Sequence, residues 1–441
     1  MRKVLAINRY TGIDQRSSVG TPDHPIANGP NAPSITEINK IFMSDGVPLA
    51  VSAARQALTE ARLEPTQITH MVSTTCTNSA NPGYDHFVAR DLGLSPSLEK
   101  VLLHGVGCSG GLAALRTAAN LCLGHAMRGL PARILVVALE ISTTLVRSEL
   151  DSINADQETR IGIALFSDCA GALVLSNGLG AIDEAPLAPP VYELLGWEHH
   201  TIPDTEGDLG FDVDPLGWKV VLTPRVPTLT QSVLEPSYKA LLDALPRPPP
   251  PATYRVAADY DWAMHPGGAT ILTGAEKALG ITPEHMRASY DTYINHGNSS
   301  SATIISVLNR LRSKDMDAMT PGGRGPRDHV VGCAFGPGIS VEMCMLRRNL
   351  TAPPSGLQTP PETESEPSEA GGLASEIGDE RTSDFDETVA GGELSSTNAS
   401  SGSKPVIEST GGNTTASSAR LETAKEAESF ISEALESVEL D

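Results

Sequence analysis

The chain has 441 residues and a formal net charge of −22 at pH 7. Residues 351–441 hold 19 acidic and 4 basic side chains, so 15 of the 22 negative charges lie in this tail. The preceding part has no basic stripe with interleaved aromatic residues and no run of about eighteen apolar residues, which excludes a nucleic-acid-binding surface and a membrane span.

The cysteines and the N-terminus indicate the compartment. Six cysteines occur, with no CxxC pair and no regular spacing. This distribution is typical of free thiols in a reducing compartment. The first ten residues contain too short an apolar stretch for a signal peptide, so we expect a soluble, cytoplasmic protein.

The first half of the chain alternates apolar strands with helical patterns, which predicts an α/β fold with a largely parallel sheet. Loops are expected over 1–46 and 148–158. The periodicity predicts helices over 48–62, 86–92 and 110–124, and strands over 68–75, 101–106, 134–140 and 170–176.

The second half begins with a segment rich in Pro, Asp and Gly, and we expect an irregular insertion over 178–220. Helices are predicted over 228–245, 269–279 and 303–312, and strands over 260–264, before Gly297, and over 330–335 and 340–346. The tail contains no Cys, His, Met, Tyr or Trp and is expected to be disordered.

Cys108 lies in a glycine-rich turn between a predicted strand and a predicted helix. The positive end of the helix dipole favours a thiolate there, so Cys108 is a candidate nucleophile. Two alternatives remain open at this point. The pattern GVGCSG at 105–110 also fits a dinucleotide-binding turn, with Glu140 as a ribose-binding carboxylate, and Cys108 could be a small buried cysteine.

Cys108, His265 and Asn298 each follow a predicted strand beside glycines, so their side chains can converge at one edge of a sheet. An imidazole can hold a thiol as a thiolate, and an imidazole with an amide N–H can stabilise an oxyanion on a thioester carbonyl. This chemistry requires no metal and no cofactor. Taken singly, His265 could be a turn histidine and Asn298 a helix cap.

Four motifs resemble those of type III polyketide synthases, the chalcone synthase superfamily. In order, they are GCSGG at 107–111, WAMHPGG at 262–268, GNSSSA at 297–302 and FGPGISVE at 335–342. The loop with TCTN at 75–78 and NPGY at 81–84 resembles the fungal branch, which includes alkylresorcinol and alkylpyrone synthases. The resemblance covers about residues 8–348.

The resemblance implies a thiolase-like αβαβα fold with duplicated halves, 1–178 with the nucleophile and 179–350 with the histidine and asparagine, followed by a disordered acidic tail, 351–441. It implies a homodimer in which the cysteine takes an acyl group from an acyl-CoA. The enolate formed by decarboxylation of malonyl-CoA then attacks the thioester, and repetition and cyclisation give an alkylresorcinol, a resorcylic acid or an α-pyrone. In this fold the glycine turn carries the nucleophile, which argues against the dinucleotide reading.

The resemblance also assigns a substrate cavity. Phe166 is similar to a gatekeeping phenylalanine between the CoA tunnel and the cavity, and the second gatekeeping aromatic falls near Pro224. The other positions carried over are Cys76 and Ser300 in the wall and the loop Gly336, Pro337 and Gly338. Loss of an aromatic at Pro224 would open apolar space, so we expect a medium or long fatty acyl starter.

The family has about fifty residues before the block that resembles 11–18, whereas ten precede it here, so we expect the natural start to lie upstream. The CoA-binding cations of that region are reduced to Arg16, with Arg9 as a weaker candidate. The acidic tail is expected to be a solvated segment, with docking to a starter-supplying synthase as the alternative.

Two other functions compete. A ketoacyl-synthase-III-like acyltransferase shares the three residues but usually reads His-Gln-Ala-Asn where this chain has HPGG at 265–268. An inactive thiolase-fold binding protein is the alternative from a different class, because of the short N-terminus and the long tail.

Overall fold

A computed structural model describes residues 7–21, 23–156, 161–180, 188–214, 217–245 and 254–352. The described part contains two four-stranded sheets and a two-stranded sheet. The predicted disorder of the tail concerns residues that, from 353 onward, lie outside the described ones.

The first sheet has the strand order β2-β1-β3-β4. Its strands are β1 (His70–Thr74), β2 (Glu99–Leu103), β3 (Arg133–Ile141) and β4 (Asp168–Ser176). β1 pairs in parallel with β2 and β3, and β4 closes the sheet antiparallel to β3. Strand β3 is buried along almost its whole length because helices cover both faces of the sheet, whereas the first three residues of the edge strand β2 are exposed.

The second sheet has the order β5-β10-β9-β8. Its strands are β5 (Tyr192–Thr201), β8 (Asp261–Met264), β9 (His329–Gly336) and β10 (Ser340–Arg348). β8 and β9 are parallel, and β10 is antiparallel to both of its neighbours. The first sheet thus joins three parallel strands to one antiparallel strand, and the second joins the parallel strands β8 and β9 to the antiparallel β10, a similar mixed arrangement in both halves. The two-stranded sheet consists of β6 (Leu209–Asp214) and β7 (Gly217–Leu222).

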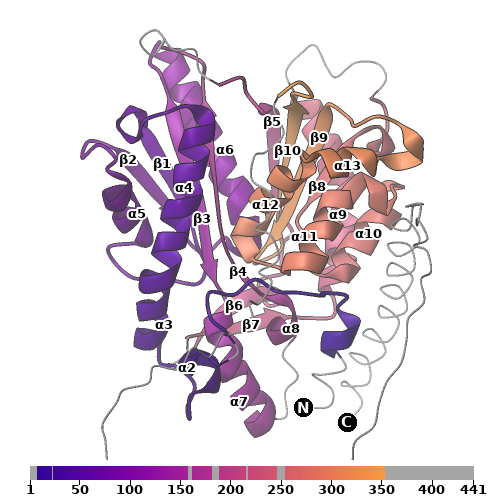
Figure 1. Cartoon of the computed structure of the whole chain (residues 1–441). Helices are drawn as coiled ribbons and strands as arrows, with labels where there is room; N and C mark the ends of the chain where they lie inside the picture. The colour runs from indigo at the N-terminus through magenta and orange to yellow at the C-terminus, as the bar shows by residue number, and fades with distance from the viewer. Residues whose placement is uncertain are drawn as a thin grey trace, which may run out of the picture. The chain divides into compact units, whose positions relative to one another are not determined.

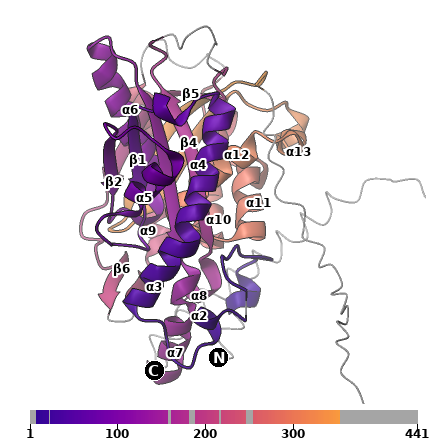
Figure 2. The same ribbon diagram turned by 60° about the vertical axis from the view of Figure 1, so that its left-hand side comes forward.

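The helices form three layers around the two sheets (Figure 1). Helices α4 (Val47–Ala61) and α5 (Tyr84–Leu92) pack on the outer face of the first sheet, and Figure 2 brings α4 to the front of it. Helices α6 (Gly110–Met127) and α12 (Thr303–Leu311) lie between the sheets and share a core with both. Helices α9 (Val226–Ala244) and α10 (Ala269–Leu279) cover the outer face of the second sheet. The predicted αβαβα layering is confirmed.

The remaining helices are short or lie at the ends of the layers. They are α2 (Pro25–Asn28), α3 (Ile35–Ile41), α7 (Val146–Asp156), α8 (Gly162–Leu165), α11 (Arg287–His296) and α13 (Lys314–Ala318). Among the described helices, none is both long and apolar enough to cross a bilayer.

Besides the strand predicted before Gly297, which is the helix α11, three of the secondary-structure predictions are wrong in the described residues. The expected N-terminal loop contains α3, which continues through a π-helical turn, Phe42–Gly46, into α4. The polar stretch after 145 is helix α7, whose Val146, Leu150 and Ile153 form an apolar stripe that packs with Ile163. The stretch from 178 to 220 supplies β5, β6 and most of β7. β5 forms a strand because it pairs with β10, which lies more than a hundred residues later in the chain.

Candidate active site

Cys108 lies in a single 3-10 turn, Gly107–Ser109, directly before α6. Gly107 has φ +49°, and a Cβ at this position would lie 2.6 Å from Cδ of Pro337. Glycine is therefore required at 107, both for the left-handed backbone and for the close approach of the loop that contains Pro337. This explains the glycine before the cysteine in the GCSGG motif.

His265 follows the last residue of β8. Its backbone N–H donates to the carbonyl of Cys333 on β9 over 2.7 Å, which continues the parallel pairing of the two strands. The side chain is 1% exposed, and neither ring nitrogen has a hydrogen-bond partner among the described residues. Burial without a charged partner lowers the pKa of His265 to about 3. The imidazole is therefore neutral and retains one free N–H donor.

Asn298 follows α11, a helix and not the strand predicted before Gly297. Gly297 ends this helix with φ +74°. The backbone of Asn298 then bridges to the segment around Phe166, with hydrogen bonds from Asn298 N–H to the Leu165 carbonyl (3.0 Å) and from Ser167 N–H to the Asn298 carbonyl (2.9 Å). The position of Asn298 thus depends on the α8 segment of the other half of the fold.

The Asn298 side chain has a defined orientation. Its Oδ1 accepts a hydrogen bond from the N–H of Ser300 over 2.8 Å, and its Nδ2 donates to the Gly267 carbonyl over 3.2 Å. The first contact lies within a turn and is not a helix cap, because the 3-10 turn and α12 that follow have Ser299 and Ala302 at their N-cap positions and no side-chain cap. A primary amide has two N–H donors, so one of them remains available after the bond to Gly267. The side chains of Ser300 and Asn298 both act to lower the pKa of the Cys108 thiol.

A buried ion pair aligns the segments that lead to His265 and Asn298. Asp261 begins β8 and Arg287 begins α11, and their side chains are 0% and 1% exposed. The guanidinium donates twice to the carboxylate, over 2.9 and 2.7 Å. Paired charges in this geometry hold the strand and the helix in a fixed relation.

One cavity of about 510 Å³ connects these residues. Cys108, His265 and Asn298 all line it, which confirms that the fold brings the three side chains together. Of the predicted cavity residues, Cys76, Phe166, Pro224, Ser300 and Pro337 also line it. Gly336 and Gly338 lie in the same loop without lining it; the Gly338 N–H donates to the Leu209 carbonyl of β6 over 2.9 Å.

Beside Phe166 the cavity has a second aromatic ring, which the sequence interpretation did not identify. Pro224 does line the cavity, but Phe211 of β6 packs edge to face against Phe166, with ring centroids 5.9 Å apart. The second aromatic ring therefore comes from a strand that the sequence interpretation treated as irregular. In the sequence, Phe211 lies in a stretch, 209–214, where apolar and polar residues alternate, which is the pattern of a half-buried strand.

Arg16 does not line the cavity. Its guanidinium donates to the carbonyls of Ile163 and Phe166, the latter over 3.2 Å, and burial lowers its pKa. These contacts give it a structural role under α8. The lysine among the cavity-lining residues is Lys277, which is exposed in the last turn of α10.

Burial also decides the ionisation of Cys108. Desolvation raises the pKa of the Cys108 thiol to about 11, and the side chains of Ser300 and Asn298 oppose this rise only in part. Burial thus outweighs the dipole of α6, contrary to the expectation that the turn alone favours a thiolate. A proton acceptor beside the thiol is needed to make it reactive near neutral pH.

Glu140 lies behind the cavity wall, and the sequence interpretation considered it only within the dinucleotide alternative that it set aside. It is 0% exposed at the end of β3 and accepts hydrogen bonds from the Thr77 hydroxyl (2.8 Å) and from the N–H of Cys76 (3.1 Å). A fully buried carboxylate cannot reach a ribose, so the dinucleotide reading is excluded for this residue. It supports the wall of the cavity behind Cys76, and burial raises its pKa.

Comparisons with known proteins were made for the sequence and for the structure. The sequence matches the family profiles described as chalcone and stilbene synthases, N-terminal domain, over residues 8–178, and C-terminal domain, over residues 194–350. Acylalkylpyrone synthase csyB from Aspergillus oryzae is 40% identical over 348 residues, which covers 79% of this chain and 86% of that protein.

The fold is similar to two solved structures. A fungal type III polyketide synthase, ORAS, is 72% identical with a TM-score of 0.76, over 79% of this chain and 91% of that one. CsyB complexed with CoA-SH is 39% identical with a TM-score of 0.74, over the same shares of the two chains.

Proposed function

The chain belongs to the chalcone and stilbene synthase family and is a type III polyketide synthase, and we propose that Cys108 is its acyl-accepting nucleophile. In this proposal residues 1–178 supply the cysteine, and residues 179–350 supply His265 and Asn298. The observation that carries it is the single cavity lined by all three side chains. Family membership also favours this function over a ketoacyl-synthase-III-like acyltransferase and over an inactive binding protein.

The first step loads the starter. His265 takes the proton of the Cys108 thiol, and the thiolate attacks the carbonyl of an acyl-CoA. The C–S bond to CoA breaks, and CoA leaves with a proton. The free N–H of Asn298 and the N–H of His265 donate to the oxyanion of the tetrahedral intermediate, where preorganised donors have their largest effect.

The second step extends the chain. Malonyl-CoA loses CO₂, and its enolate attacks the carbonyl of the Cys108 thioester. A C–C bond forms, the thioester bond breaks, and the thiolate is regenerated with a β-ketoacyl-CoA that is two carbons longer. The same two donors stabilise the enolate oxygen before the attack and the tetrahedral oxyanion after it. Repetition and ring closure give an alkylresorcinol, a resorcylic acid or an α-pyrone.

The starter is a medium or long fatty acyl group. Support comes from the apolar walls of the cavity, which include Leu209, Phe211, Val220, Leu222 and Ile271. Burial of each methylene contributes about 0.8 kcal/mol, so a chain of ten methylenes gains several kcal/mol over an acetyl group. At the entrance, we place Lys277 in the role expected of Arg16, as a cation for the phosphates of CoA.

The test is mass-spectrometric analysis of the products. The purified protein is incubated with malonyl-CoA and a series of acyl-CoA starters from acetyl to stearoyl, beside benzoyl- and coumaroyl-CoA. We expect pyrone or resorcinol products with the fatty starters, no products with Cys108→Ala, and full activity with Cys122→Ala, a matched cysteine on α6 outside the cavity. Products that persist in Cys108→Ala would refute the nucleophile, and a preference for the aromatic starters would refute the substrate class.

A further inference from the structure

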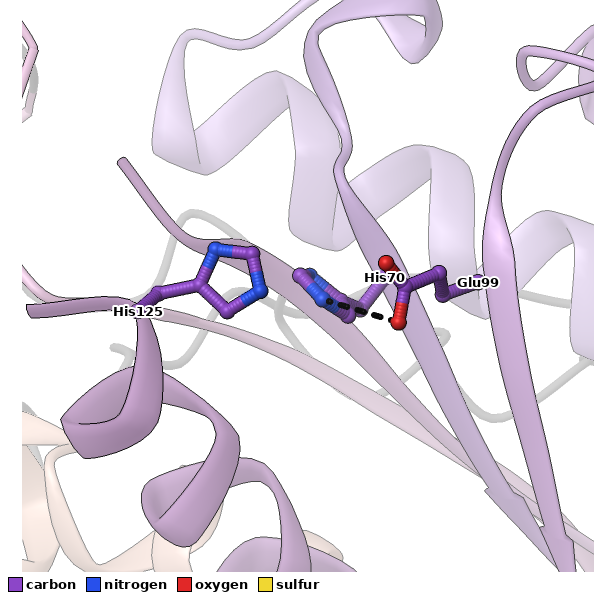
Figure 3. Close-up of side chains that lie close together, drawn as sticks. All are labelled: His70, Glu99 and His125. Carbon is purple, nitrogen blue, oxygen red and sulfur yellow. Dashed lines mark ion pairs between the residues drawn. The ribbon is translucent and has the colours of Figure 1, made fainter. Parts of the chain in front are cut away.

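A cluster of two histidines and a glutamate lies at the end of α6 opposite to the turn that contains Cys108. His70 is the first residue of β1, Glu99 is the first residue of β2, and His125 is in the last turn of α6. His70 and Glu99 are direct partners in the parallel register, so their side chains project from the same face of the sheet. Figure 3 shows the two rings and the carboxylate facing one another. The ligand atoms of the three residues lie within 4.8 Å of one another.

The hydrogen bonds of Thr69 are compatible with a metal-binding tautomer of His70. The Thr69 hydroxyl donates its only hydrogen to the Arg133 carbonyl over 3.0 Å. In this arrangement it accepts from His70 Nδ1, which lies 2.7 Å from it, and the lone pair of the ring is on Nε2. A hydrogen bond from one ring nitrogen to a neighbouring oxygen, with the other nitrogen free, is the arrangement found around metal-bound histidines.

Two buried nitrogen atoms in the cluster have no hydrogen-bond partner among the described residues: Nε2 of His70 and Nδ1 of His125. His70 is 2% exposed, so water does not compensate for its missing bond. Nε2 lies 3.7 Å from the Glu99 carboxylate, which is too long for a hydrogen bond. The two rings meet edge to face with centroids 4.4 Å apart. A group that accepts three electron pairs would satisfy all three residues.

We propose that His70, Glu99 and His125 bind one divalent transition-metal ion of the Zn²⁺ class, with water as the fourth ligand. Two imidazoles and one carboxylate match the ligand preference of such ions and not that of Ca²⁺ or Mg²⁺, which prefer oxygen. Tetrahedral coordination with Zn–N distances of 2.0–2.1 Å places neighbouring ligand atoms about 3.3 Å apart. The side chain of Glu99 is 73% exposed and can therefore move the short distance required.

The ion has a structural role. β2, the Cys108 turn and α6 follow one another along the chain, and the ion joins the beginning of β2 to the end of α6. It thereby closes the segment that presents the nucleophile. At 1.5 Å per residue, His125 lies about 25 Å along α6 from Cys108, so the ion takes no part in the condensation.

The test uses the full-length protein after removal of metal by a chelator, titrated with Co²⁺ and then with competing Zn²⁺. The readouts are the visible absorption of Co²⁺ and the binding stoichiometry. We expect one equivalent per chain with the absorption of a tetrahedral site. Affinity falls at least 100-fold in His125→Gln and at least 10-fold in Glu99→Gln, and it is unchanged in His200→Gln, a matched exposed histidine on β5. Polyketide formation is retained in all three variants.

The proposal is overturned if the wild-type protein binds no stoichiometric Co²⁺, or if His125→Gln and Glu99→Gln bind it as tightly as the wild type. Loss of binding in His200→Gln would also overturn it, because the metal would then bind at the surface of β5. Glu99 is exposed and its substitution preserves the fold, so the test does not depend on a variant of the buried His70.

Discussion

Replacing His265 by glutamine separates the effect of burial on Cys108 from the effect of the imidazole. In the variant the thiol has no proton acceptor beside it, and burial alone acts on its pKa, which is about 11. At pH 8 this leaves about one molecule in a thousand as the thiolate. The buried cysteine should then alkylate far more slowly than a free cysteine.

In the wild type the imidazole can take the proton and become a positive neighbour of the thiolate. Two opposite charges in side-chain contact, about 4 Å apart, attract each other by about 4 kcal/mol at an effective dielectric constant of 20. This attraction offsets about three of the eight pKa units that separate the His265 imidazole (about 3) from the Cys108 thiol (about 11), so the ion pair is transient and His265 acts as a general base while the thiol reacts. We therefore expect wild-type Cys108 to alkylate between about tenfold and a thousandfold faster than the variant at pH 8.

The assay is alkylation by iodoacetamide between pH 6 and pH 10, with the modified Cys108 peptide quantified by mass spectrometry. The rate in His265→Gln should rise steeply with pH because only the thiolate reacts, whereas the wild-type rate should depend less on pH, and His200→Gln should follow the wild type. Identical pH profiles for the wild type and His265→Gln would refute the reasoning, since the imidazole would then have no control over the thiol.

Three further outcomes follow from the geometry. Phe211→Ala removes one ring of the gate and should raise the activity with stearoyl-CoA relative to hexanoyl-CoA in competition assays; an unchanged ratio would show that the ring does not limit entry. Lys277→Gln should raise KM for the acyl-CoA without a matching change in kcat, and an equal KM would remove this lysine from CoA binding. Asp261→Asn leaves the buried Arg287 guanidinium without its counter-charge and should lower the free energy of unfolding in urea by about 3–5 kcal/mol. The exposed Asp91→Asn serves as its control, and a loss no larger than in this control would contradict the role of the ion pair.

The α/β alternation and the Cys108 turn were predictable from sequence because their signals are local, whereas the αβαβα layering was inferred from the resemblance to the family. An apolar run, a glycine turn and an Ala/Leu-rich helix follow directly in the chain, and the structure has β2, the 3-10 turn and α6 in this order. Helices α4, α9 and α10 were also predicted to within a few residues, since each presents a continuous apolar stripe.

Predictions failed where distant contacts determine the local structure. β5 has polar residues at one end and becomes a strand through its pairing with β10, with a bulge between Met345 and Leu346. Helix α11 carries Tyr290 and Tyr293 into the core, although its composition resembles a strand or loop. Capping signals were also overlooked: Ser34 and Glu37 form a capping box at the start of α3.

The three candidate catalytic residues were found from their motifs, but their environment was not. Sequence could not show that burial raises the pKa of Cys108, because desolvation depends on the whole fold around the cavity. Sequence also could not show that Arg16 contacts backbone carbonyls at α8 and not CoA, because these carbonyls belong to residues about 150 positions away from Arg16.

The backbone bridge between Phe166 and Asn298 limits how starter preference can be redesigned. The segments of Phe166, the proposed gate residue, and Asn298, the proposed oxyanion donor, share two backbone hydrogen bonds through Leu165, Ser167 and Asn298. A library that varies only the side chain at 166 can therefore change which chains enter while the amide stays in place. Insertions, deletions or prolines between 162 and 167 would move the amide as well, so such libraries would lose turnover together with selectivity.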